Sequence, residues 1–500
     1  MKKYTCSAAV LCIALMLFAQ TEPAASGQQP VYQTLLQYRI EHDSKHRQLQ
    51  MQAEIAANKA EKAKTESLVT TEVGSGDTQL TLNGDTAKTG VKTAPYASVL
   101  LPSYNNTGVK VRIPYNREGR TVTNPSTGSA AVMQTQNLGA EVTVSTDIYS
   151  KNAEKQKYTR GLAQSAAKQA RQAEEEGISL AEKQFLQDIQ KLLDDYTTLL
   201  DKELNEVKAE IQYNQTKTQG YAETSTKMRT ADLELLSAKR EHQNADFNFS
   251  ASYRVFAESC GIAPEENPRA FLTTLWDSIP IQKAADIEQY PLTAYKALVE
   301  AEQRHLQNTV KRDIELSPFA LGAEAGYLLR NTQTTLSGAS TKERAHAVLG
   351  GLTMQFPGGK AYTGVEIPLS DPKSTAFKLA FSWNPFSIRY RKLDKHNAEL
   401  EHAIEMLKIE DAKEQYRKQL QSHKISSEQM TWQQTATADE LSIYKQNAED
   451  HARWYRSGII NRFENLRAEL EYKKAEARHA KAKTAVIIFN IDTALLFEKQ

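Results

Sequence analysis

The chain repeats one unusual order of segments in its two halves. Each half reads as a helix, a β-rich stretch, an exceptionally long helix, a short break and a second long helix. The clearest matching pair of segments is Thr107–Pro114 (TGVKVRIP) and Thr363–Pro368 (TGVEIP). A duplicated unit usually builds a closed or quasi-symmetric object, because neither copy can bury its apolar faces alone. The repeat therefore favours one chain that passes twice through the same layers over a string of unrelated domains.

The N-terminus has the pattern of a secretory signal. Lys2 and Lys3 form a basic start, residues 8–19 are apolar, and small residues follow at 24–26. This apolar segment is too short to span a bilayer, so residues 1–26 are predicted to be a signal peptide. A lipoprotein signal is the competing interpretation, but Leu11 precedes Cys12 where a small residue would be needed.

Composition excludes several classes of protein. The remainder of the chain has no apolar run near the length of a transmembrane helix. With 62 basic and 61 acidic residues, the formal net charge is +1, so no nucleic-acid partner is expected. Cys260 is the only cysteine after the signal segment. We expect no internal disulfide and predict Cys260 to be a small buried side chain at a helix end.

The long helices carry a coiled-coil pattern. Each spans roughly 70 residues, which at about 1.5 Å per residue gives a rod of about 100 Å. The second, from about Arg389 to Tyr455, contains no proline. In the first, apolar residues recur at intervals of mostly three and four, with Gln, Asp, Lys and Glu between them, as in knobs-into-holes packing. These residues are Phe185, Ile189, Leu192, Tyr196, Leu199, Val207 and Ile211.

The β-rich segments alternate between apolar and polar residues. Val109, Val111 and Ile113 alternate with Lys110 and Arg112, and the same period recurs in 142–145, 319–327 and 377–383. Such alternation is the weak signature of a transmembrane β-barrel strand, although a soluble sheet with one wet face gives it too. Together with a signal peptide and two long helical hairpins, this alternation favours a membrane barrel. The Gly-, Ser- and Thr-rich stretch 117–139 is predicted to be a surface loop.

Two motif regions resemble the TolC-like outer-membrane efflux proteins. Residues 455–468 (YRSGIINRFENLRA) resemble the family's tip motif, Tyr-x-x-Gly followed by a polar residue, an acid, Leu and Ala. Residues 290–297 (YPLTAYKA) resemble its Asn-Pro-x-Leu helix start, and Ser317-Pro318 stands where the family enters a strand. In the first repeat, 234–238 (ELLSA) matches less well, with Met228 and Ser225 replacing the expected glycine and tyrosine. The resemblance covers essentially the whole chain after the signal segment.

The resemblance implies an α+β membrane protein that assembles as a homotrimer. Each chain would give four strands to a twelve-stranded outer-membrane barrel, and the duplicated coiled-coil hairpins would form an α-barrel in the periplasm. The second repeat instead has four strand-like stretches, 319–329, 348–356, 362–369 and 377–383, of which we expect the middle pair to be an inserted hairpin. The predicted segments are: signal 1–26; helix 27–66; strands 67–149; hairpin 150–261; linker 262–288; helix 289–316; strands 317–386; hairpin and C-terminus 387–500.

The hairpin turns are the predicted contact sites. Gly458 suits the positive φ that ends a helix, and Asn461 with Glu464 suits a capping box at the next helix start. An ordinary hairpin turn explains these residues equally well. The resemblance implies that Met228, Arg229, Thr230, Ala231, Gly458, Ile459, Ile460 and Asn461 contact an adaptor. It also makes Tyr455, Glu464 and Arg467 gate candidates, where a Glu464–Arg467 ion pair and a plain exposed pair remain open.

No catalytic motif is present: the chain has no phosphate-binding loop, CxxC pair or nucleophile elbow. His42 and His46 lie four apart but lack a third ligand, so an exposed helix face is preferred to a metal site. The sequence thus predicts no enzyme, cofactor or metal. The resemblance implies a passive outer-membrane conduit, reaching into the periplasm, which meets a periplasmic adaptor and an inner-membrane transporter in efflux or type I secretion. An adaptor protein or a structural coiled-coil envelope protein remain the alternatives.

Overall fold

The computed structural model describes residues 31–82, 90–123, 129–265, 267–317, 319–337 and 339–498. The predicted signal peptide and Pro318 lie outside these ranges. The chain divides into two compact units. The helical unit contains residues up to 43, 180–284 and 428–490. The sheet unit contains residues 44–179, 285–427 and those from 491 onward.

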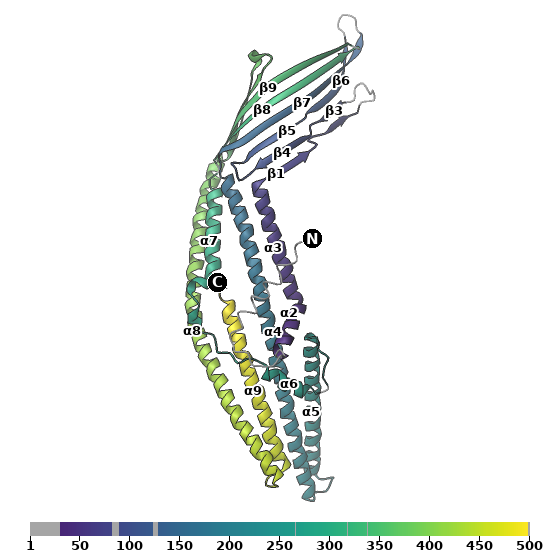
Figure 1. Ribbon diagram of the computed structural model, residues 1–500, viewed down its shortest axis with the longest axis vertical. Coiled ribbons are helices and arrows are strands. Elements are labelled where there is room, and N and C mark those ends of the chain that lie inside the picture. The colour runs from purple at the N-terminus through teal and green to yellow at the C-terminus, as the bar shows by residue number, and fades with distance from the viewer. Residues whose placement is uncertain are drawn as a thin grey trace, which may run out of the picture. The chain divides into compact units, whose positions relative to one another are not determined.

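Both halves follow the order that the sequence predicts, namely helix, strands, long helix, break and second long helix (Figure 1). The first half consists of α2 (Val31–His42), α3 (Ser44–Leu68), β1 (Thr70–Gly74), β2 (Gln79–Thr81), β3 (Gly90–Thr93), β4 (Tyr96–Leu101), β5 (Thr107–Arg112), β6 (Tyr115–Thr123), β7 (Ala130–Tyr149), α4 (Asn152–Thr218), α5 (Thr226–Ser259) and α6 (Pro268–Asp277). The second consists of α7 (Lys296–Glu315), β8 (Ala320–Leu336), β9 (Ala339–Phe356), β10 (Gly359–Pro368), β11 (Ala376–Trp383), α8 (Ser387–Arg456) and α9 (Arg462–Leu495).

The N-terminal helix differs from its prediction. Residues 27–66 were expected to form one helix, but α2 ends at His42 and α3 begins at Ser44, with Asp43 between them. His46 is buried rather than exposed, and its ring lies 3.1 Å from the side-chain amide of Gln50. His42 instead stacks on Tyr38, with ring centroids 4.0 Å apart. The predicted exposed histidine face is therefore wrong for His46.

The predicted seam of the first long helix forms the core of the helical unit. α4 is 67 residues long and α8 is 70. Phe185, Ile189, Leu192, Tyr196 and Leu199 are all buried, whereas Val207 and Ile211 are half-buried. Rings from other elements complete this core. They pack as Tyr196–Phe249 at 5.5 Å, Tyr253–Phe271 at 5.4 Å and Tyr32–Phe185 at 5.6 Å between centroids.

Small side chains let α9 pack closely in the helical unit. Ala475, Ala477 and Ala480 are buried, as are Val486 and Ile487. Polar contacts also join α9 to α4. Gln190 donates to the Thr484 hydroxyl at 3.0 Å, and Lys481 donates to the Asp194 carboxylate at 2.7 Å. The buried Lys474 ammonium pairs with Asp201 and Glu471, so its charge is compensated.

The sheet unit is built on one antiparallel sheet of eleven strands among the described residues. The main order is β1-β4-β5-β7-β8-β9-β10-β11, and β6, β3 and β2 continue from the other half of β7. Figure 1 shows β1, β4, β5, β7, β8 and β9 side by side. The 20-residue β7 is central because it pairs with β5, β6 and β8.

Three strand predictions need correction. The described residues form eleven strands of the sheet where the resemblance implies four per chain. Residues 117–139 were expected to be a loop, yet most of them lie in β6 and β7, which pair from Tyr115↔Leu138 to Thr123↔Ala130. The middle pair of the second repeat, β9 and β10, is not a separate hairpin. The pair lies between β8 and β11 in the same sheet, because β9 also pairs with β8 and β10 also pairs with β11.

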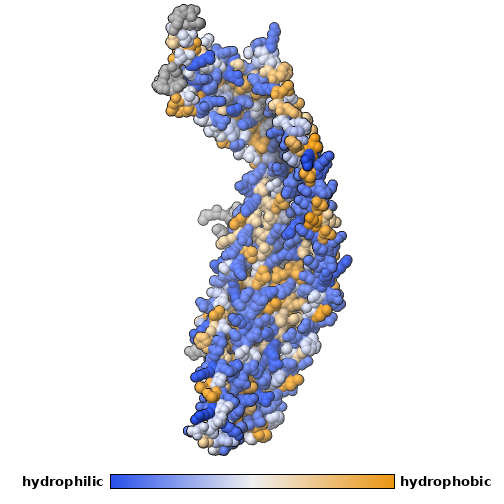
Figure 2. All heavy atoms as spheres, turned by 180° about the vertical axis from the view of Figure 1, so that it is seen from behind, coloured by the Kyte–Doolittle hydropathy of each residue, from blue (hydrophilic) through white to orange (hydrophobic). Residues whose placement is uncertain are grey.

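Helices α7 and α8 pack together beside the sheet unit's C-terminal residues. Their apolar cluster contains Tyr295, Leu298, Ile409, Ala412 and Phe497. Tyr295 and Phe497 also form an antiparallel bridge. The helical surfaces seen in Figure 2 are mostly hydrophilic, with hydrophobic residues in scattered patches. This distribution fits helices that bury only one narrow seam.

Within the described residues, none of the helices has an apolar stretch long enough to cross a membrane.

Candidate functional site

Strand register places the apolar side chains of the sheet on one face, here called the apolar face. The pairing aligns side chains of the same orientation into rows across neighbouring strands. One row runs through Val73, Ala97, Val111, Val142, Tyr327, Val348 and Ile367, from β1 to β10. The next runs through Thr71, Val99, Val109, Val144, Ala325, Gly350, Val365 and Phe377, from β1 to β11. Almost every member of both rows is apolar.

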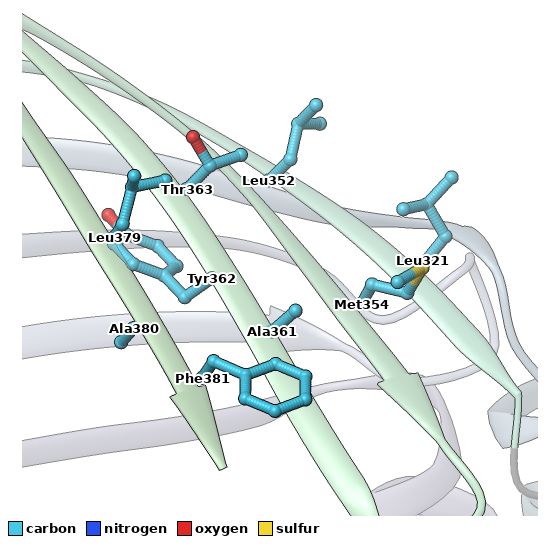
Figure 3. Close-up of a pocket in the computed structure, with 9 residues that line it drawn as sticks. All are labelled: Leu321, Leu352, Met354, Ala361, Tyr362, Thr363, Leu379, Ala380 and Phe381. Carbon is cyan, nitrogen blue, oxygen red and sulfur yellow. The ribbon is translucent and has the colours of Figure 1, made fainter. Parts of the chain in front are cut away.

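These apolar side chains are not covered by other described residues. Val73 is 84% exposed, Leu379 is 83% exposed and Phe377 is 78% exposed. Figure 3 shows part of this surface, where Leu321, Leu352, Ala361 and Phe381 lie on four neighbouring strands. A water-soluble monomer rarely leaves so continuous an apolar surface uncovered, so this face marks contact with a membrane or another protein.

The opposite face, here called the polar face, carries charge and hydrogen bonds. The Tyr362 hydroxyl donates to Glu324 at 2.7 Å, and Lys378 lies 3.3 Å from Glu366. Tyr96 donates to Glu72 at 2.5 Å, and the Lys110 ammonium lies 4.5 Å from the Tyr96 ring centroid. The two faces therefore have opposite characters, as in a wall between an apolar medium and water.

Aromatic side chains lie at both ends of the apolar rows. At the end nearest the starts of α4 and α8, Tyr149 contacts Phe319 at 5.7 Å between ring centroids, and Phe356 contacts Phe381 at 5.9 Å. Trp383 ends β11 at the same level, opposite Gly359. Tyr115 and Tyr327 lie toward the other end. Paired aromatic girdles of this kind flank the apolar band of membrane barrels.

The sheet ends in unpaired edges. Among the described strands, β1 pairs with β4 alone and β11 pairs with β10 alone. All eight residues of β11 are exposed. Free backbone groups at such an edge pair readily with another strand. The main strand order thus ends in two edges that a second copy could use.

The turn between α8 and α9 has the geometry that the sequence predicts. Gly458 has a φ of +74° and ends α8. The Asn461 side chain accepts from the Glu464 N–H at 2.9 Å, and the Glu464 carboxylate accepts from the Asn461 N–H at 3.2 Å. This reciprocal pair is a capping box. Ile459 lies between Gly458 and Asn461, and its side chain is 70% exposed.

The turn between α4 and α5 lies earlier than predicted. It occupies residues 219–225, where Gly220 has a φ of +75°. The Ser225 hydroxyl accepts from the Met228 N–H at 3.3 Å and caps α5. The predicted turn residues Met228, Arg229, Thr230 and Ala231 are instead helical, and both Met228 and Ala231 are buried. The error arose because a family glycine was sought at Met228, whereas Gly220 and Ser225 carry the usual turn signals.

The gate candidates lie at the second turn. Tyr455 is the second-last residue of α8, and Glu464 and Arg467 lie on exposed positions of α9. Within one chain, the described contacts of Glu464 are those of the capping box and include no ion pair with Arg467. Cys260 is buried, as expected, and burial raises the pKa of its thiol.

A polar cluster that the sequence reasoning missed joins α7 to α8 in the sheet unit. His305, His402 and Glu405 have ligand atoms within 4.8 Å of one another. Glu405 accepts from Arg312 at 2.9 Å, from His305 at 2.9 Å and from Asn308 at 2.7 Å. Burial alone would raise the pKa of Glu405, but these hydrogen bonds outweigh it and lower the pKa. The His-x-x-Glu spacing was visible in the sequence, but its partner helix was not.

Comparison with known families gives a match over both halves. Residues 35–279 match the TP096X N-terminal domain, and residues 280–500 match the TP096X C-terminal domain. The chain belongs to the TP096X family. A similar uncharacterised protein of Treponema pallidum (strain Nichols) is 28% identical over 486 residues, which cover 96% of this chain and 84% of that protein. A second T. pallidum protein is 23% identical over 483 residues, covering 93% of this chain and 85% of its own length.

Two solved structures resemble this TP096X protein at low sequence identity. The CmeC outer membrane channel of Campylobacter jejuni gives a TM-score of 0.47 at 12% identity, covering 96% of this chain and 91% of CmeC. The outer membrane protein VceC of Vibrio cholerae gives 0.47 at 10% identity, covering 93% of this chain and 94% of VceC.

Proposed function

We propose that the chain forms an outer-membrane channel whose helices continue as a periplasmic tunnel. In this role it is the passive conduit of a tripartite efflux or type I secretion system. The observation that carries the proposal is the exposed apolar face, which continues through neighbouring strands from β1 to β11. A lipid-facing wall needs such a surface, and the charged face behind it suits an aqueous lumen.

The size of the apolar face supports a membrane role. On β8 the apolar rows extend from Leu321 to Leu329, which is roughly 26 Å along the strand. A strand tilted by about 45° crosses the hydrocarbon core in roughly 9–11 residues. The aromatic residues at the two ends of these rows match the levels of the two interfaces.

The free edges support an oligomer, and the resemblance implies that this oligomer is a homotrimer. Open sheet edges do not occur in lipid, because unpaired backbone groups cost several kcal/mol there. Pairing of β11 in one copy with β1 in the next would close the wall. Crosslinking in detergent should give a discrete oligomer, and a species that remains monomeric would refute this part of the proposal.

A periplasmic adaptor and an inner-membrane transporter are the proposed partners, with the second turn as a contact. Ile459 offers an exposed apolar side chain there. Replacing Ile459 with Asp should reduce export, whereas Gly458→Asn should be tolerated because Asn adopts positive φ at small cost. Gly458→Pro should abolish export, since proline requires a negative φ. Oligomer assembly should survive all three changes, because the strands belong to the other unit.

The gate proposal can be separated from the capping role of Glu464. Three copies of Glu464 around one opening would attract cations and repel one another. Glu464→Gln removes the charge but keeps a capping-box side chain. In planar bilayers Glu464→Gln should raise the conductance and reduce the cation selectivity. Asn461→Ala should change neither quantity, because its effect is limited to fraying at the start of α9. An unchanged Glu464→Gln channel would leave only the structural role.

Detergent dependence tests the channel against the two alternatives. A channel should fractionate with the outer membrane and require detergent for extraction. A periplasmic adaptor or a structural coiled-coil protein would not need an integral barrel, and an adaptor would carry one hairpin in a β-domain rather than a duplication. Release of the chain by salt or alkaline washing alone would refute the channel.

A further inference from the structure

Four strands continue past the apolar rows as a polar sheet, here called the polar extension. It comprises β6, the first part of β7 and the facing ends of β8 and β9. On β8 the change is abrupt, because Leu329 is followed on the same face by Asn331, Gln333 and Thr335. Cross-strand pairing continues to Leu336↔Ala339, so this part of the sheet remains ordered without an apolar surface.

The two faces of the polar extension carry different charges. On the face that continues the apolar face, Arg117, Lys342 and Arg344 are exposed. Register fixes this placement, since Arg344 pairs with Asn331, Lys342 pairs with Gln333, and Arg117 pairs with Gln136. The described strand residues on this face include no acid, and none of the three cations has an ion pair among the described residues. The acids Glu118 and Glu343 lie on the opposite face.

The three cations lie at the depth of lipid headgroups if the apolar face lies in a bilayer. Asn331 and Gln333 follow Leu329 by two and four residues, or roughly 7 and 13 Å along the strand. With a strand tilt near 40°, these become depths of roughly 5 and 10 Å beyond the hydrocarbon. The headgroup region itself is about 5–8 Å thick on each side. Long Arg and Lys side chains span the remaining distance.

We infer that Arg117, Lys342 and Arg344 bind the phosphates of anionic lipid headgroups in the adjacent leaflet. Arginine pairs with phosphate through two parallel hydrogen bonds, and lysine adds a point charge. His346 lies on the same face opposite Leu329 and contacts Tyr327, so a ring pair separates the cations from the hydrocarbon. The inference rests on the proposed membrane function, because only an inserted apolar face sets this depth.

The chain provides a matched control for the test. Three exposed cations of the same strands or of neighbouring β3 lie on the opposite face, namely Arg120, Arg330 and Lys92. The triple change R117Q/K342Q/R344Q and the control K92Q/R120Q/R330Q remove equal charge. Tyr115→Trp, made in a chain whose four tryptophans are replaced by Phe, supplies the reporter. Tyr115 pairs with Leu138, which pairs with Asn331 in the row of Arg344.

The experiment measures which lipid contacts the reporter. The full chain is reconstituted in phosphatidylcholine vesicles, and quenching by brominated phosphatidylglycerol is compared with quenching by brominated phosphatidylcholine. The unmodified chain should prefer phosphatidylglycerol at least about fivefold, because each cation near an anionic surface contributes about 1 kcal/mol. R117Q/K342Q/R344Q should reduce the preference to about one, and the control should retain it.

Two outcomes would overturn the inference and remain distinguishable. Quenching without headgroup preference, or equal loss in both triple variants, would refute lipid binding by these cations while leaving the inserted sheet intact. Absence of quenching by either brominated lipid would mean that the sheet does not enter the bilayer, and the proposed function would fail with it. Arg344→Gln alone should give a partial loss, which serves if the triple variant does not insert.

Discussion

Arginine placed at the centre of the apolar face should destabilise the inserted sheet strongly. In the β7–β8 pairing, Val144 lies opposite Ala325, midway between Leu321 and Leu329. An arginine at the bilayer midplane costs about 2–4 kcal/mol in a membrane barrel, and near the interfaces about 0–1 kcal/mol. Val144→Arg should therefore lower the free energy of unfolding by about 2–4 kcal/mol. Gln333→Arg, beyond the apolar rows, should cost almost nothing.

The neighbouring residue gives the control. Ser145 lies on the polar face of the same strand, opposite Glu324, so an arginine there gains a cross-strand carboxylate. Urea titration in phosphatidylcholine vesicles, followed by tryptophan fluorescence, measures both variants. Equal costs for Val144→Arg and Ser145→Arg, or a larger cost at Ser145, would refute the assignment of the two faces.

Three further predictions concern the helices. Asn461→Ala should remove about 1 kcal/mol from the α9 terminus and speed hydrogen exchange at the Glu464 amide about fivefold, whereas Asn461→Asp should not. The pKa of Glu405 is lowered in the folded chain, so this residue stabilises the fold fully above its ordinary pKa of 4.5. That stabilisation is lost as the pH falls through the lower pKa of the folded state. Glu405→Gln should therefore weaken the loss of stability at acid pH, measured by thermal unfolding at a series of pH values. Cys260 should react with a thiol reagent only on unfolding, because it is buried and its thiol pKa is raised; rapid labelling of the folded chain would contradict its place in the core.

The sequence by itself determined the features that depend on nearby residues. Heptad-like spacing at Phe185, Ile189 and Leu192 predicted a buried seam, because residues three and four apart share one helix face. Asn461 and Glu464 predicted a capping box, because both partners lie within one helical turn. Alternation at Val109 and the other strand residues likewise predicted a two-faced sheet.

Only the tertiary structure decided the features that depend on distant pairing. The apolar rows join β1 to β11 through eight strands whose register no local pattern specifies. The inserted-hairpin interpretation of β9 and β10 failed for this reason, since alternation is the same in a separate hairpin and in a central strand pair. The Glu405 cluster likewise needed α7 beside α8, which brings His305 to a residue far along the chain. Side-chain period fixes which faces a strand has, but backbone pairing fixes which neighbours share them.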